Sequence, residues 1–149
     1  MVLRNAGTVT YCRAVADDEV VNRIAELHAT DVAAHELGIE LRSAGPGAAI
    51  VELTVADKHL GSHGQMHGGV LFTLADVAMS YAGNSRGGLS MAIRASIDYV
   101  DTCALGDRLI ASATEHSLRG KAGIYDVTIR TVDDDRLIAT FRGNTLRLS

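Results

Sequence analysis

One acidic side chain interrupts a long apolar segment near the middle of the sequence. Asp76 lies within the run Gly69–Gly83, and a charged carboxylate buried without hydrogen-bond partners is very costly. At helical spacing, the small and oxygen-bearing residues of this run share one stripe, formed by Gly69, Thr73, Asp76, Ser80 and Gly83. The stripe predicts either a cleft wall with a functional carboxylate, or a structural Asp76 that accepts hydrogen bonds from Ser80, Thr73 or a neighbouring backbone.

The sequence His67-Gly68-Gly69 stands where this helix is expected to begin. Free N–H groups at a helix N-terminus attract anions, and glycines let a ligand come close. Such a donor, combined with a carboxylate, is suited to hydrolysis of an ester-like carbonyl. Gly68 and Asp76 are about 12 Å apart along a helix, because each residue adds about 1.5 Å. That is too far for both groups to contact one carbonyl. If they act together, the Gly68 amide must therefore come from a second subunit.

Two helices and six strands are predicted to position these residues. The helices cover residues 17–35, where Asp17 or Asp18 can cap the first turn, and residues 69–83, which end on a glycine. The expected strands cover residues 36–44, 48–56, 91–100, 108–118, 123–132 and 136–148, and their short links make neighbours antiparallel. Because residues 69–83 are apolar on nearly every face, we expect a curved sheet and a second copy of the chain to cover them.

Composition narrows the class of protein. A length of 149 residues, with 47% hydrophobic and 21% charged residues, predicts one globular domain over residues 1–149. The net charge is −4 and basic residues are not clustered, so no nucleic-acid partner is expected. The apolar stretches are far shorter than the ~20 residues of a membrane helix, so no membrane association is expected.

The cysteines and histidines predict no metal site. Cys12 and Cys103 lack a CxxC partner, and the segment Met1–Tyr11 lacks the apolar core of a secretory signal, so we expect reduced thiols in a cytoplasmic protein. Three histidines recur at a spacing of four residues, at His59, His63 and His67. The glycines between them break a helix, and no cysteine or acidic ligand joins them.

The residues around Asp76 resemble a known family. The block HGGVLFTLAD, residues 67–76, and several shorter motifs are similar to the hotdog-fold acyl-CoA thioesterases, in particular to the phenylacetate-degradation subfamily. The shorter motifs are Leu37-Gly38-Ile39, Tyr81-Ala82, Asn84-Ser85, Ser96-Ile97-Asp98-Tyr99, Gly106-Asp107, Gly120-Lys121, Gly123-Ile124-Tyr125-Asp126-Val127 and Phe141-Arg142-Gly143. The resemblance implies an α+β hotdog fold, in which a curved antiparallel sheet wraps around one long central helix.

The resemblance also implies an activity and a set of site residues. The reaction is hydrolysis of an acyl-CoA thioester, with phenylacetyl-type or medium acyl groups as candidates; coenzyme A is part of the substrate, and no separate cofactor is implied. Asp76 matches the catalytic carboxylate, as general base or nucleophile, Gly68 of the partner subunit matches the oxyanion donor, and Ser80 matches an assisting hydroxyl. Substrate contacts are expected from Gly69, Asn84, Ser85, Arg119, Gly120 and Lys121. The implied assembly is a homodimer or a homotetramer of two dimers.

One position departs from the family pattern, and two other functions stay open. Related enzymes have Asn or Gln six residues before the His of this block, where this sequence has Gly61. The residues that could replace that side chain are His59, His63 and Gln65. His67 fits a role in structuring the loop better than a role as catalytic base. The alternatives are a dehydratase of enoyl or hydroxyacyl thioesters, which would use His67 with Asp76, and a non-catalytic acyl-CoA-binding protein.

Overall fold

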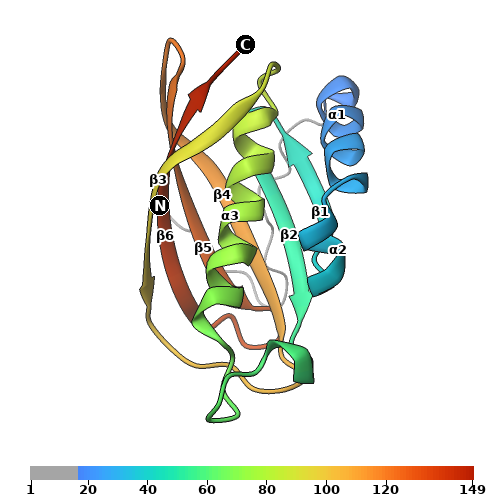
Figure 1. Cartoon of the computed structure of the whole chain (residues 1–149), viewed down its shortest axis with the longest axis vertical. Helices are drawn as coiled ribbons and strands as arrows, with labels where there is room; N and C mark the ends of the chain where they lie inside the picture. The colour runs from blue at the N-terminus through green and yellow to red at the C-terminus, as the bar shows by residue number, and fades with distance from the viewer. Residues whose placement is uncertain (1–16) are drawn as a thin grey trace, which may run out of the picture.

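The strands form one antiparallel sheet that curves around a long helix (Figure 1). The computed structural model describes residues 17–149, so Cys12 and the segment Met1–Tyr11 lie outside the described residues. In chain order the strands are β1 (Glu40–Gly45), β2 (Ala48–Thr54), β3 (Ser90–Tyr99), β4 (Arg108–Arg119), β5 (Ala122–Thr131) and β6 (Leu137–Arg147), and their order in the sheet is β1-β2-β4-β5-β6-β3. The expected α+β architecture, a curved antiparallel sheet around one helix, is confirmed.

Helix α3 (Gly68–Asn84) lies against the concave face of this sheet. Alternate residues of the strands point toward it, and they bury an apolar core that includes Val51, Leu53, Leu74, Ala78, Leu109, Val127 and Ile129. Figure 1 shows that the side of α3 turned away from the sheet has no strand over it. Thr73, Asp76 and Ser80 on that side are only half-buried. One sheet therefore covers only part of the helix, as its apolar pattern indicated.

The N-terminal segment forms two helices, so the prediction of a single helix over residues 17–35 is wrong. Helix α1 (Asp18–Ala29) ends at Thr30, and helix α2 (Val32–Leu37) follows directly. The Asp31 carboxylate accepts a hydrogen bond from the Ala34 N–H at 3.0 Å and thereby begins the second helix. Gly38 has a φ of 75° and ends it, which delays the first strand from residue 36 to residue 40.

The other boundaries agree with the expected ones to within two residues, but the end of α3 has a different cause. Gly83 does not terminate the helix, which continues through Asn84. A Cβ at Gly83 would lie 3.4 Å from Thr145 Cγ2, so this position of α3 packs against β6. A 3₁₀ turn, η1 (Asp57–His59), precedes the loop that leads into α3.

Candidate active site

The first turn of α3 is capped by a histidine side chain. His67 adopts an extended backbone conformation, and its Nδ1 accepts a hydrogen bond from the Gly69 N–H at 2.9 Å. The His67 carbonyl accepts hydrogen bonds from the Val70 and Leu71 N–H groups. His67 therefore structures the start of the helix, as favoured from the sequence, and its Nδ1 is engaged by the backbone.

These bonds leave one donor of the first turn available. Within residues 17–149, the Gly68 N–H has no hydrogen-bond acceptor, whereas the Gly69 N–H is engaged by His67. The Gly68 carbonyl accepts a hydrogen bond from the Tyr99 hydroxyl at 3.0 Å. Tyr99 belongs to a motif of the resemblance, but nothing in the sequence pattern indicated this contact. The helix thus begins with a free amide, as an oxyanion site requires.

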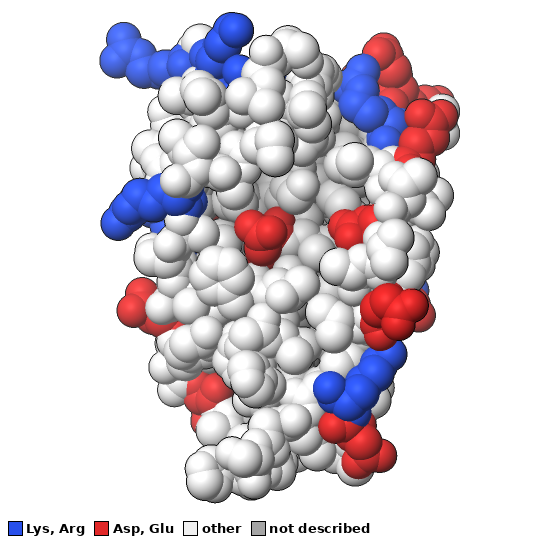
Figure 2. All heavy atoms as spheres, in the orientation of Figure 1, with Lys and Arg blue, Asp and Glu red and all other residues white. Residues whose placement is uncertain are grey.

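Asp76 lines a hollow on the open side of α3. The hollow has a volume of about 340 Å³ and is lined by Leu27, Asp76, Met79, Ser80, Asn84, Leu89, Ser90, Met91, Ala92 and Thr145. Figure 2 shows the same face. Its middle is uncharged apart from a few acidic side chains, and the Lys and Arg side chains lie toward its rim. The carboxylate expected inside an apolar helix is therefore half-buried at the wall of a cleft rather than enclosed in a dry core.

The surroundings of Asp76 disfavour its charge. Burial raises the pKa of the Asp76 carboxyl, and the negative charge of Asp31 raises it further. No side-chain hydrogen bond reaches Asp76 from the described part of the chain, and the Thr73 hydroxyl donates to the Gly69 carbonyl at 2.9 Å instead. The arrangement therefore favours the cleft-wall interpretation of the stripe over a structural Asp76.

The polar side chains that follow Ser80 at the end of α3 form hydrogen bonds within the chain. The side chain of Ser80 is half-buried and lines the hollow one turn beyond Asp76. The Asn84 amide group donates to the carbonyls of Ser80 at 2.9 Å and Ser90 at 3.0 Å, and its oxygen accepts from the Ser90 N–H. Ser85 Oγ donates to the Ala82 carbonyl and accepts from the Gly47 N–H at 2.7 Å. Both residues are buried, which does not favour the substrate contact expected of them.

The remaining candidate contacts lie at two exposed places. Arg119 ends β4, and Gly120 and Lys121 form the turn that leads into β5, where Gly120 has a φ of 57° that suits glycine. Gly69 is exposed beside the cap of α3, and its N–H is already bonded to His67. The structure thus brings Asp76 and Ser80 together, and places Gly68 and Gly69 at the other end of the same helix.

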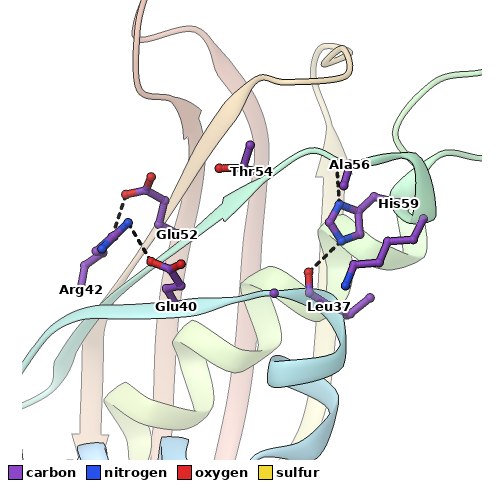
Figure 3. Close-up of a pocket in the computed structure, with 9 residues that line it drawn as sticks. Leu37, Glu40, Arg42, Glu52, Thr54, Ala56 and His59 are labelled. Atoms are coloured by element: carbon purple, nitrogen blue, oxygen red, sulfur yellow. Dashed lines mark hydrogen bonds and ion pairs between the residues drawn. The ribbon is translucent and has the colours of Figure 1, made fainter.

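His59 does not replace the side chain missing at Gly61. Figure 3 shows the His59 ring between two backbone groups: Nδ1 accepts from the Ala56 N–H at 2.9 Å, and Nε2 lies 2.7 Å from the Leu37 carbonyl. The residue is 1% exposed, so its role is structural, which does not favour His59 as the replacement for the side chain missing at Gly61. His63 and Gln65 are exposed on the loop that leads to α3. A Cβ at Gly61 would lie 3.6 Å from His67 Cδ2, beside the cap.

A second carboxylate withdrawn from solvent was not singled out from the sequence. Glu52 of β2 points to the outer face of the sheet and lines a separate hollow of about 200 Å³ (Figure 3). It accepts hydrogen bonds from Arg42 Nε at 2.8 Å and Arg108 Nε at 3.0 Å. Burial alone would raise the pKa of Glu52, but the two arginines outweigh it and lower the pKa. Because the two arginines neutralise its charge, the Glu52 carboxylate stabilises the sheet.

A hydrogen-bonded chain joins the two short helices to α3 and was also missed. The Tyr81 hydroxyl donates to Asp31 Oδ2 at 2.9 Å and lies 2.9 Å from His28 Nδ1. Tyr81 is buried, and burial raises the pKa of its hydroxyl, with the hydrogen bond to Asp31 adding to the effect. Burial and the neighbouring His35 lower the pKa of His28. These bonds fix α1, whose Leu27 forms part of the hollow at Asp76.

Between residues 17 and 149, no three or more His, Cys, Asp or Glu side chains are grouped to hold a metal ion. The same range contains no helix with the length and apolar character needed to span a membrane.

Comparison with known proteins identifies the family. Residues 63–138 match the model of the thioesterase superfamily. The acyl-coenzyme A thioesterase PaaI of Escherichia coli (strain K12) is 36% identical over 122 residues, which cover 82% of this chain and 86% of that protein. The chain belongs to the thioesterase superfamily and is a thioester hydrolase.

Solved structures agree with this assignment. The E. coli PaaI protein, described as part of the phenylacetic acid degradation operon, has a TM-score of 0.83 at 34% identity, covering 86% of this chain and 92% of that chain. A Streptococcus mutans UA159 protein bound to acetyl CoA has a TM-score of 0.72 at 26% identity, covering 74% of this chain and 89% of its own. The fold is therefore the hotdog fold, with α3 as the central helix.

Proposed function

We propose that this protein hydrolyses acyl-CoA thioesters to a free acid and coenzyme A, with Asp76 as general base or nucleophile and Gly68 as the oxyanion donor. The observation that carries the proposal is the carboxylate without a partner at the wall of the hollow, on the same helix as a free N-terminal amide. Similarity to PaaI and to the acetyl-CoA-bound Streptococcus mutans protein supports the substrate class.

Asp76 and Gly68 act from different subunits in this proposal. Eight residues of helix separate them, a distance of about 12 Å. Among the described strands, β3 pairs only with β6, and its exposed side chains include Met91, which is 54% exposed, and Ile93, which is 63% exposed. An edge strand of this kind is suited to pairing with a second copy. Joined at β3, two sheets would cover the open side of α3 and bring Gly68 of the partner subunit toward Asp76.

Water, Asp76 and the Gly68 N–H are sufficient for each bond and proton transfer of the proposed hydrolysis. Acting as a base, the Asp76 carboxylate takes a proton from water while the water oxygen bonds to the thioester carbon, and the carbonyl oxygen becomes an oxyanion bonded to the Gly68 N–H. Collapse of this intermediate breaks the C–S bond, and the departing thiolate takes the proton from Asp76. Acting as a nucleophile, the Asp76 carboxylate would bond to the thioester carbon and break the C–S bond, which gives a mixed anhydride and the coenzyme A thiolate; water then hydrolyses the anhydride to the free acid and Asp76, and the proton released goes to the thiolate. The raised pKa makes the ionised carboxylate a stronger base than an ordinary Asp.

The hollow favours an apolar acyl group. Leu27, Met79 and Met91 contribute unbranched or singly branched apolar side chains beside Asp76. A neighbouring hollow of about 350 Å³ shares Leu27, Asn84 and Leu89 with it and extends toward Arg23 and Glu26. We propose aromatic acyl groups of the phenylacetyl type or medium-chain acyl groups as the substrates, and a cytoplasmic enzyme that forms a dimer or a tetramer of two dimers.

Thiol release from a panel of acyl-CoA esters tests the proposal. Phenylacetyl, hydroxyphenylacetyl, benzoyl, short-chain and long-chain esters are compared for the wild type, Asp76→Asn and, as a matched control, Asp133→Asn in the exposed β5–β6 turn. Asp76→Asn should lower kcat about 10³-fold on the best ester, whereas Asp133→Asn should not change it. Equal kcat values for the two variants would contradict the role of Asp76, and hydration of a crotonyl thioester without thiol release would favour the dehydratase.

Two substitutions at one position isolate the proposed donor. Proline is tolerated at the first position of a helix but lacks the N–H, so Gly68→Pro removes the donor, and Gly68→Ala adds a Cβ and keeps it. Either new Cβ would lie 3.0 Å from the Tyr99 ring, so the two variants share this crowding. We expect kcat of Gly68→Pro to be about 10²-fold below that of Gly68→Ala. Similar kcat values would remove Gly68 from the mechanism.

A further inference from the structure

The peptide group between Gly68 and Gly69 is held at both of its ends by side chains. Its N–H, on Gly69, donates to His67 Nδ1 at 2.9 Å, and its carbonyl, on Gly68, accepts from the Tyr99 hydroxyl at 3.0 Å. The Tyr99 ring also lies against Gly68, because a Cβ built there would be 3.0 Å from Cζ and 3.3 Å from Cε1. Tyr99 ends β3, so a strand far away in the sequence fixes the first turn of α3.

This attachment matters because two consecutive glycines are conformationally free. Without Cβ atoms, Gly68 and Gly69 can adopt many more backbone conformations than other residues. An oxyanion donor stabilises a transition state only if its N–H is already oriented, and a displacement of about 1 Å can cost a large part of the rate. The Gly68 N–H itself belongs to the His67–Gly68 peptide, whose carbonyl accepts hydrogen bonds from the Val70 and Leu71 N–H groups. Tyr99 holds the other side of the Gly68 Cα, through its ring contact and its hydrogen bond to the Gly68 carbonyl, and so restricts the φ and ψ angles of Gly68 that join the two peptides.

We propose that Tyr99 is a positioning residue that orients the Gly68 N–H for the Asp76 site of the partner subunit. The inference rests on the proposed function, since it assigns to Tyr99 a part in that same site. Tyr99 does not touch the reacting atoms in this arrangement. Its hydroxyl and ring hold the Gly68 backbone, and the hydrogen bond to the carbonyl is the part that a phenylalanine could not supply.

Tyr99→Phe removes only the hydroxyl and tests the inference. We expect kcat to fall about tenfold while KM stays within about twofold, because a misoriented donor affects the transition state and not substrate binding. Tyr125→Phe is the matched control: its hydroxyl lies 3.3 Å from Glu115 Oε2, away from the start of α3, and its loss should leave kcat unchanged. A Tyr99→Phe enzyme with wild-type kcat, or with a change in KM alone, would overturn the inference.

Mixed dimers separate this inference from the proposed function. When Asp76→Asn and Tyr99→Phe chains carrying different tags are co-expressed, a mixed dimer has one site with Asp76 from one chain and a Gly68 held by Tyr99 from the other. Thiol release by the purified mixed dimer should exceed that of either parent severalfold. The matched control combines Tyr99→Phe with the double variant Asp76→Asn/Tyr99→Phe, where no Gly68 is held by Tyr99, and should show no gain.

The outcomes have different meanings. A mixed dimer that shows no gain over the Tyr99→Phe parent would overturn the positioning of Gly68 across the subunit interface, even if Asp76→Asn alone is inactive. An Asp76→Asn enzyme that keeps its kcat would overturn the proposed function, and the inference with it.

Discussion

Asp76 and Glu52 are both carboxylates withdrawn from solvent, and each lines a hollow, but their surroundings are opposite. Glu52, on the outer face of the sheet, accepts hydrogen bonds from Arg42 and Arg108, which lower the pKa of its carboxyl. Asp76, on the open side of α3, faces apolar side chains and the charge of Asp31, and the pKa of its carboxyl is raised. The paired carboxylate stabilises the sheet, and the unpaired one is available for proton transfer.

The difference shows why burial alone does not identify a functional acid. Glu52 is the more deeply buried of the two, at 6% exposure, yet two cations make its charged form stable. A base needs the reverse: a charged form that the site stabilises poorly and that a proton can neutralise. The absence of a cation beside Asp76 within the described residues is therefore as informative as its position on the helix.

The largest expected contrast is in stability. Glu52→Gln should lower the free energy of unfolding by about 2 kcal/mol at neutral pH, because it removes the carboxylate that Arg42 and Arg108 share and leaves Arg42 paired only with Glu40. Asp76→Asn should leave the free energy unchanged or raise it, because its surroundings already disfavour the charge. Urea unfolding at pH 7 measures both.

The same variants give a pH test with a defined sign. A lowered pKa means that Glu52 contributes stability above its unfolded-state pKa, and this contribution is lost as pH falls through its folded-state pKa. The wild type and Glu52→Gln should therefore become more similar in acid. A constant difference at all pH values would contradict the ion-pair explanation.

A cation placed beside Asp76 should lower the pKa of its carboxyl, as the two arginines do for Glu52. Position 80 lies one helical turn beyond Asp76, so Ser80→Lys brings an ammonium group to the carboxylate, lowers the pKa of Asp76 and weakens it as a base. Ser80→Met is the matched control because its side chain occupies similar space without charge. We expect kcat/KM of Ser80→Lys to be about tenfold below that of Ser80→Met, measured by thiol release. Equal values would mean that the unpaired state of Asp76 is not required.

The smallest expected effect on catalysis comes from removing the negative charge of Asp31 near Asp76. Asp31→Asn keeps the cap of α2 and an acceptor for Tyr81, but removes the negative charge that raises the pKa of Asp76. The acid limb of the kcat/KM profile should therefore move to lower pH, since Asp76 stays ionised further into acid. A profile that is unchanged, or displaced to higher pH, would exclude Asp31 as a determinant of the Asp76 pKa.

Local patterns in the sequence predicted most of the fold. The apolar run of α3 and the short links between strands depend on neighbouring residues, so the helix, the antiparallel strands and their approximate bounds could be inferred. The break at Asp31 was missed because a capping Asp resembles an ordinary helix residue within a longer amphipathic pattern. The end of α3 was expected at Gly83 and lies at Asn84, because a glycine favours the end of a helix but does not impose it.

The candidate site was partly visible for the same reason. The sequence by itself determined that Asp76 stands in an apolar helix that starts at His67-Gly68-Gly69, because those facts depend only on order and helical spacing. The tertiary structure decided that Glu52 is paired, that His59 is structural, and that Tyr99 holds Gly68, although 31 positions separate the last two residues in the chain. Such contacts depend on how the sheet folds over the helix, and no local spacing encodes them.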